Sequence, residues 1–277
     1  MKADLHLHSS RSDGTLSPGK LADRALRHGL TLIAVTDHDV LRGSDELIES
    51  APGIDVLPGT ELSLRDMDGL HLLLYGRRPA GMLRERLLEL RNRREDRARR
   101  MLDKLAAFGM PIDRETLRSG SEGSVGRMHI ARAMVAAGYA SSTQEAFDRW
   151  IGNGRPAYDA GERMSMSEAL DLAARCGWVP VLAHPYELKC CDSALLALVK
   201  GWQAQGLRGI EVYHPSAETR GYEGLDRMAR SLGMLVTGGS DFHTPGNRHT
   251  HCEIGGMCRH WHRMEEDVAA LLRAVTE

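Results

Sequence analysis

The chain begins with the alternating run Lys2-Ala3-Asp4-Leu5-His6-Leu7-His8, which predicts a β-strand over residues 2–7. In a strand, residues two apart point to the same face, so His6 and His8 can bind one ion together. Asp241 and His243 repeat this spacing near the other end of the chain, directly after a second strand-like segment. Both ends of the chain are therefore predicted to contribute to metal binding.

Other imidazole and carboxylate side chains follow strand-like segments between these two pairs. They occur as Asp13 and within Thr36-Asp37-His38-Asp39, Gly59-Thr60-Glu61, His71, Ala183-His184-Pro185 and Gly239-Ser240-Asp241-Phe242-His243. In α/β barrels and open α/β sheets, functional sites lie at the carboxyl ends of the strands. Because such side chains recur at so many strand ends, we interpret them as one cluster of nine metal ligands: His6, His8, Asp13, His38, Glu61, His71, His184, Asp241 and His243. The catalytic centre is expected at His6, His8, Glu61, Asp241 and His243.

The ligand types indicate the chemistry. Nitrogen and oxygen ligands without thiolate favour Mn, Zn or Fe, and we expect two or three divalent ions, with Mn first. Clustered ions of this kind most often serve phosphate-ester hydrolysis, because they lower the pKa of a bound water and offset charge in the transition state. Glu61 is the candidate for a carboxylate that bridges two ions. Ser240 is then not needed as a nucleophile and is expected to be structural.

Composition excludes several other classes. At 277 residues with 42% hydrophobic residues, the chain can bury a sizeable core, and its net charge of −2 argues against wholesale non-specific binding to nucleic acid. No apolar run reaches the roughly 18 residues that a membrane span needs, and a cytoplasmic location without a membrane or a stable protein partner is expected. Five cysteines at irregular spacing do not predict a disulfide framework. A zinc site near Cys252 and Cys258, with His249, His251, His260 and His262, is conceivable but fits no common zinc pattern.

Strands and helices alternate in the first and last parts of the chain, which predicts an α/β fold with parallel pairing. Strands are expected at residues 2–7, 32–35, 54–58, 70–75, 179–183, 209–213 and 235–238. Helices are expected between them at residues 17–28, 45–50, 167–176, 193–205, 221–232 and 264–275. Ser17 and Ser167 are the predicted N-caps of two of these helices, and Gly29 is a predicted C-cap.

The segment from Pro79 to Arg163 has a different pattern, with helices expected at residues 83–108, 112–117, 126–137 and 142–151. We call it the helical insertion, and residues 1–78 and 164–277 the predicted metal-binding barrel. The insertion has 16 Lys and Arg against 12 Asp and Glu, a net charge of +4, which leaves −6 for the remainder. This split suits an anionic substrate. The arginines from Arg84 to Arg100 could instead form a solvated helix face, with pairs such as Glu95 and Arg99.

Together these motifs resemble the PHP (polymerase and histidinol phosphatase) family, and the resemblance extends from His6 to His243. It implies a distorted (β/α)7 barrel that holds up to three metals. By resemblance, His6, His8, Glu61 and Asp241 would hold the first metal. Glu61, His71 and His184 would hold the second, and Asp13, His38 and His243 the third. Some relatives have histidine where this chain has Asp13, so the third site is expected to be weaker or to prefer Mn.

Within that family, the insertion and the run Ser124-Val125-Gly126-Arg127-Met128-His129-Ile130-Ala131-Arg132 resemble the branch that removes phosphate from small nucleotides. The resemblance implies removal of the 3′-phosphate from adenosine 3′,5′-bisphosphate, and related members trim RNA from the 5′ end. That branch often has proline where this chain has Met128, which puts only the local turn in doubt.

Four residues are candidates for substrate binding. Arg127 opens a predicted helix behind Gly126, where a guanidinium and a helix N-terminus can hold phosphate together, although an ordinary salt bridge is the alternative. His129 could protonate an ester oxygen or simply pack. Arg155 could reach a second phosphate from its glycine-rich loop or remain a surface residue. His214 follows a predicted strand and could face the site. Asp37 and Asp39 are expected to orient His38 or to cap helices.

The leading hypothesis is a metal-dependent phosphomonoesterase acting on a small nucleotide with two phosphates. The alternatives are a 5′→3′ exonuclease on short RNA, with arginines of the insertion lining a groove, and a histidinol-phosphate phosphatase. Because aromatics make up only 5% of the chain, few stacking platforms are available for long strands. A catalytically silent binding module is disfavoured because all nine ligand positions are filled.

Overall fold

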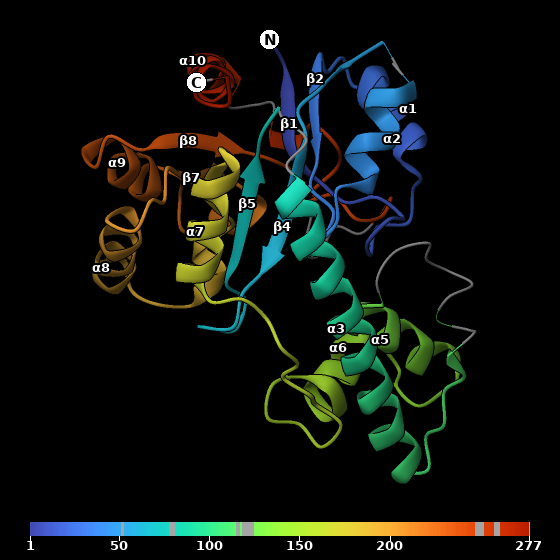
Figure 1. Cartoon of the computed structure of the whole chain (residues 1–277). Coiled ribbons are helices and arrows are strands. Elements are labelled where there is room, and N and C mark those ends of the chain that lie inside the picture. The colour runs from blue at the N-terminus through green and yellow to red at the C-terminus, as the bar shows by residue number, and fades with distance from the viewer. Residues whose placement is uncertain are drawn as a thin grey trace.

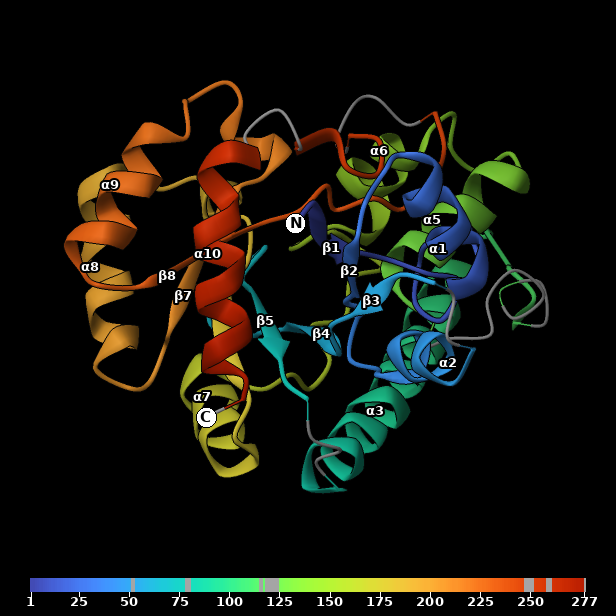
Figure 2. The same cartoon turned by 90° about the horizontal axis from the view of Figure 1, so that it is seen from above.

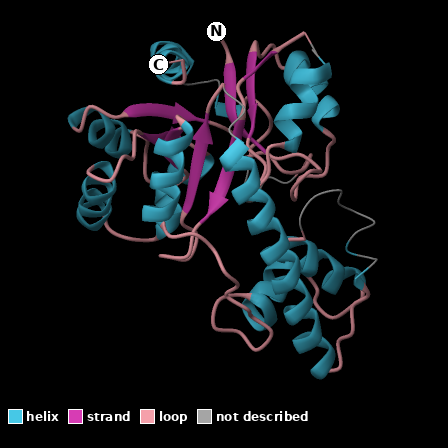
Figure 3. Ribbon diagram, in the orientation of Figure 1, coloured by secondary structure: helices cyan, strands magenta, loops and turns pink. Residues whose placement is uncertain are grey.

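The computed structural model describes residues 1–50, 53–77, 81–114, 117, 125–246, 252–257 and 261–276. It is a mixed α/β fold in which strands lie centrally and helices surround them (Figures 1 and 3). One sheet has three strands: β1 (Ala3–Leu7), β2 (Leu32–Val35) and β3 (Asp55–Val56). The second has five: β4 (Gly59–Ser63), β5 (His71–Tyr75), β6 (Val179–Leu182), β7 (Gly209–Tyr213) and β8 (Leu235–Gly238).

Strand direction differs from the prediction in the middle of the chain. β1, β2 and β3 are parallel, as are β6, β7 and β8, but β5 is antiparallel to both β4 and β6. The prediction of parallel pairing throughout was therefore wrong at β5. Residues 64–70 between β4 and β5 are too few for a parallel crossover, which needs a dozen or more residues. The predicted strand at 54–58 also ends early, because Leu57 and Pro58 separate β3 from β4 and proline has no N–H for the ladder.

The two sheets meet at two isolated bridges near the carboxyl ends of their strands. Leu7 pairs with Phe242, and His8 N donates to the Phe242 carbonyl at 3.0 Å. His38 pairs with Glu61, and Glu61 N donates to the Thr36 carbonyl at 3.1 Å. The bridges bring the ends of β1, β2, β4 and β8 to one place, which is where most of the predicted ligands lie.

Helices pack outside the strands. α1 (Pro18–Arg27) and α2 (Arg42–Ser50) lie beside the three-stranded sheet (Figure 2). α7 (Met166–Cys176), α8 (Asp192–Gln203), α9 (Glu223–Ser231) and α10 (Trp261–Ala274) lie around the five-stranded sheet, and short 3-10 helices occupy Pro185–Leu188 and Pro215–Ala217. Ser17 caps α1 as predicted, and Gly29 follows that helix with φ +72°. The N-cap of α7 is Ser165, not Ser167, because Ser165 forms a capping box with Glu168.

The insertion contains α3 (Gly81–Ala107), α5 (Arg127–Ala136), α6 (Thr143–Ala146) and a π-helix at Phe147–Ile151. α3 joins two hydrophobic clusters. Leu83 and Leu87 pack with the five-stranded sheet, whereas Met101 and Leu105 pack with α5 and its neighbours. In Figure 1 these helices form a group beside the strands, reached along α3. The predicted helix at 112–117 lies partly outside the described residues.

Among the described helices, none combines the length and apolar character needed to cross a bilayer. The suggested zinc site near Cys252 cannot be traced, because His249, His251, Cys258 and His260 lie outside the described residues, as does the side chain of His262. Cys252 itself is a partly buried free thiol.

Candidate metal centre and substrate pocket

The first predicted ligand set comes together as a buried group on three elements. His6 lies on β1 and His8 directly follows it, and their Nε2 atoms lie 3.1 Å apart. Oε2 of Glu61 lies 3.3 Å from His6 Nε2 and 3.1 Å from His8 Nε2. Oδ1 of Asp241, after β8, lies 3.4 Å from His6 Nε2 and 3.1 Å from His8 Nε2. Two imidazoles and two carboxylates therefore converge on one point.

Glu61 also faces the second predicted set. Its Oε1 lies 2.8 Å from His71 Nδ1 and 2.9 Å from His184 Nε2, and those two nitrogens are 3.2 Å apart. His38 approaches from another side, with its Nδ1 3.2 Å from Glu61 Oε2. The carboxylate of Glu61 thus has one oxygen toward each group, which is the arrangement that a bridging ligand needs.

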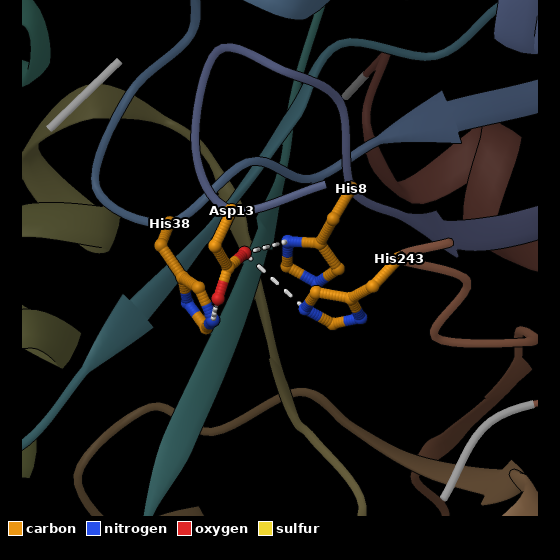
Figure 4. A group of neighbouring side chains, drawn as sticks. All are labelled: His8, Asp13, His38 and His243. Atoms are coloured by element: carbon orange, nitrogen blue, oxygen red, sulfur yellow. Dashed lines mark ion pairs between the residues drawn. The ribbon is translucent and has the colours of Figure 1, made fainter. Parts of the chain in front are cut away.

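The third group contains Asp13, His38 and His243, together with His8 (Figure 4). Oδ1 of Asp13 lies 3.2 Å from His243 Nε2 and 3.8 Å from His8 Nδ1, and Oδ2 of Asp13 lies 3.9 Å from His38 Nε2. Two of these three contacts are longer than those of the first group, and Asp13, His38 and His243 are only partly buried. The third group is therefore the more open of the three.

Opposite charges dominate the electrostatics of the cluster. Burial alone would raise the pKa of Glu61, but the nearby His38, His71 and His6 lower that pKa well below its ordinary value. Burial alone would lower the pKa of His8 and of His184, but neighbouring carboxylates raise each of these pKa values to about 10. Burial lowers the pKa of His38 to about 3. Protons therefore compete with divalent ions for the same imidazole nitrogens.

The donor set fits divalent ions. Its potential metal ligands are imidazole nitrogens and carboxylate oxygens. Among the described residues they form four groups, and within each group the ligand atoms lie no more than 4.8 Å apart. The buried atoms Asp13 Oδ1 and His38 Nδ1 make no hydrogen bond within the described part of the chain. Cations within the cluster would satisfy these two atoms, whereas a cluster of purely structural hydrogen bonds would leave them unsatisfied.

Acidic residues just outside the cluster hold its loops. Asp37, predicted to orient His38 or cap a helix, instead accepts from Ser9 N at 2.7 Å and from Ser12 Oγ at 2.6 Å, which fixes the loop after His8. Asp4 accepts from Ser240 N at 2.9 Å, consistent with a structural place for Ser240.

Sequence reasoning missed Glu211. Its Oε1 lies 2.9 Å from His6 Nδ1. Burial alone would raise the pKa of Glu211, but His6 and His214 lower that pKa below its ordinary value. The available signal was a glutamate inside the otherwise apolar strand β7, where an unpaired buried charge is rare.

A pocket adjoins the cluster, and both candidate ligands and arginines line it. Three of its lining residues are the candidate ligands Asp13, His38 and His71, and the four arginines that line the pocket are Arg94, Arg97, Arg127 and Arg163. Arg127 was predicted individually, Arg94 and Arg97 only as part of the run from Arg84 to Arg100 that could line a groove, and Arg163 was not predicted. Helical spacing alone does not tell which arginines of α3 face inward when arginines occur all around the helix.

Neighbouring groups hold these guanidiniums in place. Arg94 pairs with the buried carboxylate of Asp39 and donates to Ser63 Oγ at 2.7 Å. Arg97 Nε donates to the Asp159 carbonyl at 2.6 Å. Arg127 lies over the rings of Phe147 and Tyr158, at 5.5 and 5.7 Å from the ring centroids.

Positive charge in the pocket exceeds its compensation. Burial and the neighbouring Arg127, Arg163 and Arg94 lower the pKa of Arg97 to about 9. The pKa of Arg127 is also lowered, by burial first, although Asp68 opposes the change. A guanidinium stays charged in proteins, so the lowered values indicate mutual repulsion that a bound anion would relieve.

The other predicted substrate residues occupy different places. His129 is buried, and its Nδ1 accepts from Gly126 N at 3.0 Å at the start of α5, which agrees with the packing alternative. Arg155 is exposed and does not line the pocket. His214 is buried after β7, with its Nε2 3.5 Å from Asp241 Oδ2.

The remaining arginines of α3 agree in part with the alternative that this run forms a solvent-exposed helix face. Arg86 pairs with Glu89 and Arg99 with Asp96, both three residues apart on the helix surface. Glu95 pairs with Arg114 at 3.3 Å instead of the expected Arg99. The run from Arg84 to Arg100 therefore has both a solvated face and a pocket face.

Comparisons with known proteins agree with this geometry. A family model described as the PHP domain matches residues 4–150. A 3′,5′-nucleoside bisphosphate phosphatase of Chromobacterium violaceum is 32% identical over 249 residues, which cover 88% of this chain and 87% of that protein. A 5′-3′ exoribonuclease of Haemophilus influenzae is 31% identical over 248 residues, which cover 88% of this chain and 90% of that protein. An amidohydrolase structure from Chromobacterium violaceum with bound sulfate matches with a TM-score of 0.82 and 30% identity, covering 96% of this chain and 97% of that one.

Proposed function

The chain belongs to the PHP domain family and is a metal-dependent phosphoesterase, and from this premise we propose that it removes the 3′-phosphate from nucleoside 3′,5′-bisphosphates such as adenosine 3′,5′-bisphosphate. The observation that carries the proposal is that four arginines line the same pocket as Asp13, His38 and His71. A substrate with two phosphates can place one at the ligand cluster and the other among the arginines. A substrate with one phosphate leaves one of these two places without an anion.

We assign the nine ligands to three ions, with Mn as the expected metal. His6, His8, Glu61 and Asp241 would hold the first, Glu61, His71 and His184 the second, and Asp13, His38 and His243 the third. When bound, such ions supply activated water and stabilise the charge that develops on the phosphoryl group. His6, His8, Glu61, Asp241 and His243 form the catalytic centre in this proposal.

The fold assignment follows from the same premise. Strands β1, β2 and β4 to β8 would form a distorted (β/α)7 barrel, with the two isolated bridges joining the sheets. Residues 1–78 and 164–277 would be this PHP barrel, and residues 79–163 a helical cap over the carboxyl ends of the strands. The pocket is consistent with this division, because its ligands come from the barrel and its arginines from α3, α5 and the segment ending at Arg163.

The chain's own residues would bind and orient the second phosphate. Arg127 packs against two aromatic rings, so its guanidinium has less freedom to lose when an anion binds. Arg97 and Arg163 lie near enough to Arg127 for their charges to affect one another. Planar guanidiniums make paired hydrogen bonds to phosphate, which favours a doubly charged terminal phosphate over a neutral group. Arg155 and His214 stay candidates for further contacts to the substrate.

The test is a comparison of substrates with Mn-loaded protein. We expect phosphate release from adenosine 3′,5′-bisphosphate to exceed release from adenosine 3′-monophosphate, adenosine 5′-monophosphate and histidinol phosphate. The 3′-monophosphate is the matched control, because it has the same scissile bond and lacks only the second phosphate. Equal kcat/KM for the bisphosphate and the 3′-monophosphate would contradict the proposed role of the arginines.

A second candidate activity is 5′→3′ hydrolysis of short RNA, as the name of the Haemophilus influenzae relative describes for that protein. An RNA with a 5′-phosphate presents the same 5′ group as the bisphosphate, and its first 3′-phosphate is esterified to the next nucleotide. The arginine pocket suits both substrates for this reason. Stepwise release of 5′-mononucleotides from 5′-phosphorylated RNA, but not from 5′-hydroxyl RNA, would support it. Intact RNA after incubation with excess enzyme and Mn would exclude it.

A further inference from the structure

Strand β7 (Gly209–Tyr213) adjoins the metal cluster but supplies none of the nine assigned ligands. Its neighbours do: His184 follows β6, Asp241 follows β8 and His6 lies on β1. The polar side chain of β7 is Glu211, which is fully buried. A buried carboxylate in an apolar strand is costly unless it is paired, so its partners indicate what it does.

Glu211 uses its two oxygens for two different ligand residues. Oε1 lies 2.9 Å from the ring atom Nδ1 of His6, and Oε2 accepts from the backbone N–H of His184 at 2.8 Å. His184 has φ 26° and ψ 58°, a left-handed conformation that residues other than glycine rarely adopt. A hydrogen bond at this point therefore stabilises backbone that would otherwise relax.

The contact with His6 also determines which ring nitrogen faces the cluster. An ionised carboxylate only accepts hydrogen bonds, so Nδ1 of His6 carries the proton. Nε2, which lies 3.1 Å from His8 Nε2 and 3.3 Å from Glu61 Oε2, then has its lone pair directed into the first ligand group. Carboxylates that accept from the distant nitrogen of a metal-binding histidine have this effect in many metal sites.

We propose that Glu211 is a positioning residue shared by two metal sites: it fixes the tautomer of His6 in the first and the backbone of His184 in the second. The inference rests on the metal assignment in the proposed function. It goes beyond that assignment because Glu211 is none of the nine assigned ligands and yet links ligands on β1 and after β6. Loss of its charge should therefore weaken metal binding at both sites together.

The decisive variant is Glu211→Gln, which keeps the shape of the side chain. Both present partners donate, whereas glutamine offers one acceptor oxygen and one donor NH2 group. Either the His184 N–H loses its acceptor, or His6 must move its proton to Nε2, where the ion should bind. Thr237→Val is the matched control. Thr237 is the buried partner of Glu211 in the register between β7 and β8, and its hydroxyl makes no hydrogen bond within the described residues.

Metal affinity is measured without substrate, by competition with a chelating dye, using Mn or Zn alone. We expect E211Q to bind about 10–100-fold more weakly than the wild type, in the range seen when outer-shell partners of metal ligands are removed. The metal-free E211Q protein should unfold cooperatively but at a lower temperature than the metal-free wild type, because a buried hydrogen bond is lost, and T237V should bind metal as the wild type does. Wild-type metal affinity in E211Q would overturn the proposal.

Two further measurements separate the remaining explanations. If E211Q does not fold, Glu211→Asp is measured instead, because it keeps both acceptor oxygens but withdraws them by one methylene. Weaker metal binding by E211D supports the positioning role, and unchanged binding contradicts it. If the wild type itself binds no divalent ion, the metal assignment fails, which is a different result from equal binding by wild type and variant.

Discussion

Nε2 of His6 and Nε2 of His8, which directly follows β1, lie 3.1 Å apart, and both point at the carboxylates of Glu61 and Asp241. Two lone pairs at this distance repel unless a proton or a cation lies between them. The neighbouring carboxylates raise the pKa of His8 to about 10, although burial opposes them. The same atoms are therefore available either to protons or to metal ions, and the pH determines the outcome of that competition.

The first prediction concerns metal binding as a function of pH. His8 and His184, each with a pKa of about 10 in the metal-free protein, must release protons when an ion binds. We expect metal affinity to rise between pH 6 and 8, by up to about tenfold per pH unit for each proton released. Calorimetric titration in buffers of different ionisation enthalpy measures the released protons directly. An affinity that is constant over this range would contradict the ligand assignment.

Stability of the metal-free protein should show the opposite trend. A histidine pKa raised in the folded state stabilises the fold fully below the ordinary value of about 6.5, and this stabilisation is lost as the pH rises through about 10. The free energy of unfolding of the metal-free protein should therefore fall between pH 7 and 10. Urea unfolding after treatment with a chelator measures this free energy. Treatment with a chelator should also abolish phosphate release until divalent metal is added back.

The second prediction concerns selectivity. Arg127→Met keeps the unbranched apolar part of the side chain but removes the charge that we assign to the second phosphate. A hydrogen bond to a charged group contributes about 1.5–3 kcal/mol, so kcat/KM for adenosine 3′,5′-bisphosphate should fall about 10–100-fold. The value for adenosine 3′-monophosphate should change little. Arg99→Met is the matched control, since Arg99 is paired with Asp96 on the surface of α3. An equal loss for both substrates would mean that Arg127 does not distinguish them.

A third prediction follows from the repulsion among the pocket arginines. Because burial and nearby arginines lower the pKa of Arg127, its charge destabilises the anion-free fold. Arg127→Met should therefore raise the melting temperature in phosphate-free buffer. Added phosphate should raise the melting temperature of the metal-free wild type and have less effect on the variant. The prediction fails if phosphate stabilises both proteins equally.

The grouping of the nine candidate ligands was largely predictable from the sequence because its signal is local. Alternation at His6 and His8 and the polar residues after each apolar segment place these side chains at strand ends, and in the structure a chain of pairwise contacts joins all nine. Strand positions followed from the same pattern. Strand direction did not, because the antiparallel course of β5 depends on how few residues separate it from β4.

The substrate pocket was harder to predict because it depends on packing between distant segments. Arg94 and Arg97 belong to a helix with arginines on every side, and only the contact of α3 with the cluster shows which of them face inward. Arg163 is 69 residues beyond Arg94 in the numbering and reaches the same pocket. The role proposed for Glu211 depends on its contacts with His6 and with the backbone of His184, and both residues are distant from it in the sequence.

The fourth prediction concerns the buried pair between Asp39 and Arg94, which ties the loop after β2 to α3. Breaking such a pair on one side leaves a buried charge without compensation, at a cost of about 3–5 kcal/mol. We expect Asp39→Asn and Arg94→Met each to lower the free energy of unfolding strongly. The double variant should lose less than the sum of the two single variants. Urea unfolding of the wild type, the two single variants and the double variant completes this double-mutant cycle. If the losses in the free energy of unfolding are strictly additive, the two residues do not act as a pair.

The last prediction concerns the close approach of Gly239 to His6. A Cβ at Gly239 would lie 2.3 Å from the Cβ and 2.5 Å from the backbone N of His6, so β1 would have to move. Gly239→Ala should lower the free energy of unfolding by about 1–3 kcal/mol and weaken metal binding, because the ligand His6 moves with the strand. Gly19→Ala in α1 is the matched control, since no atom lies within 4 Å of its added Cβ. That change should raise the free energy of unfolding by about 0.5–1 kcal/mol and leave metal affinity unchanged. Wild-type metal affinity in Gly239→Ala would show that the position of β1 is not critical for the centre.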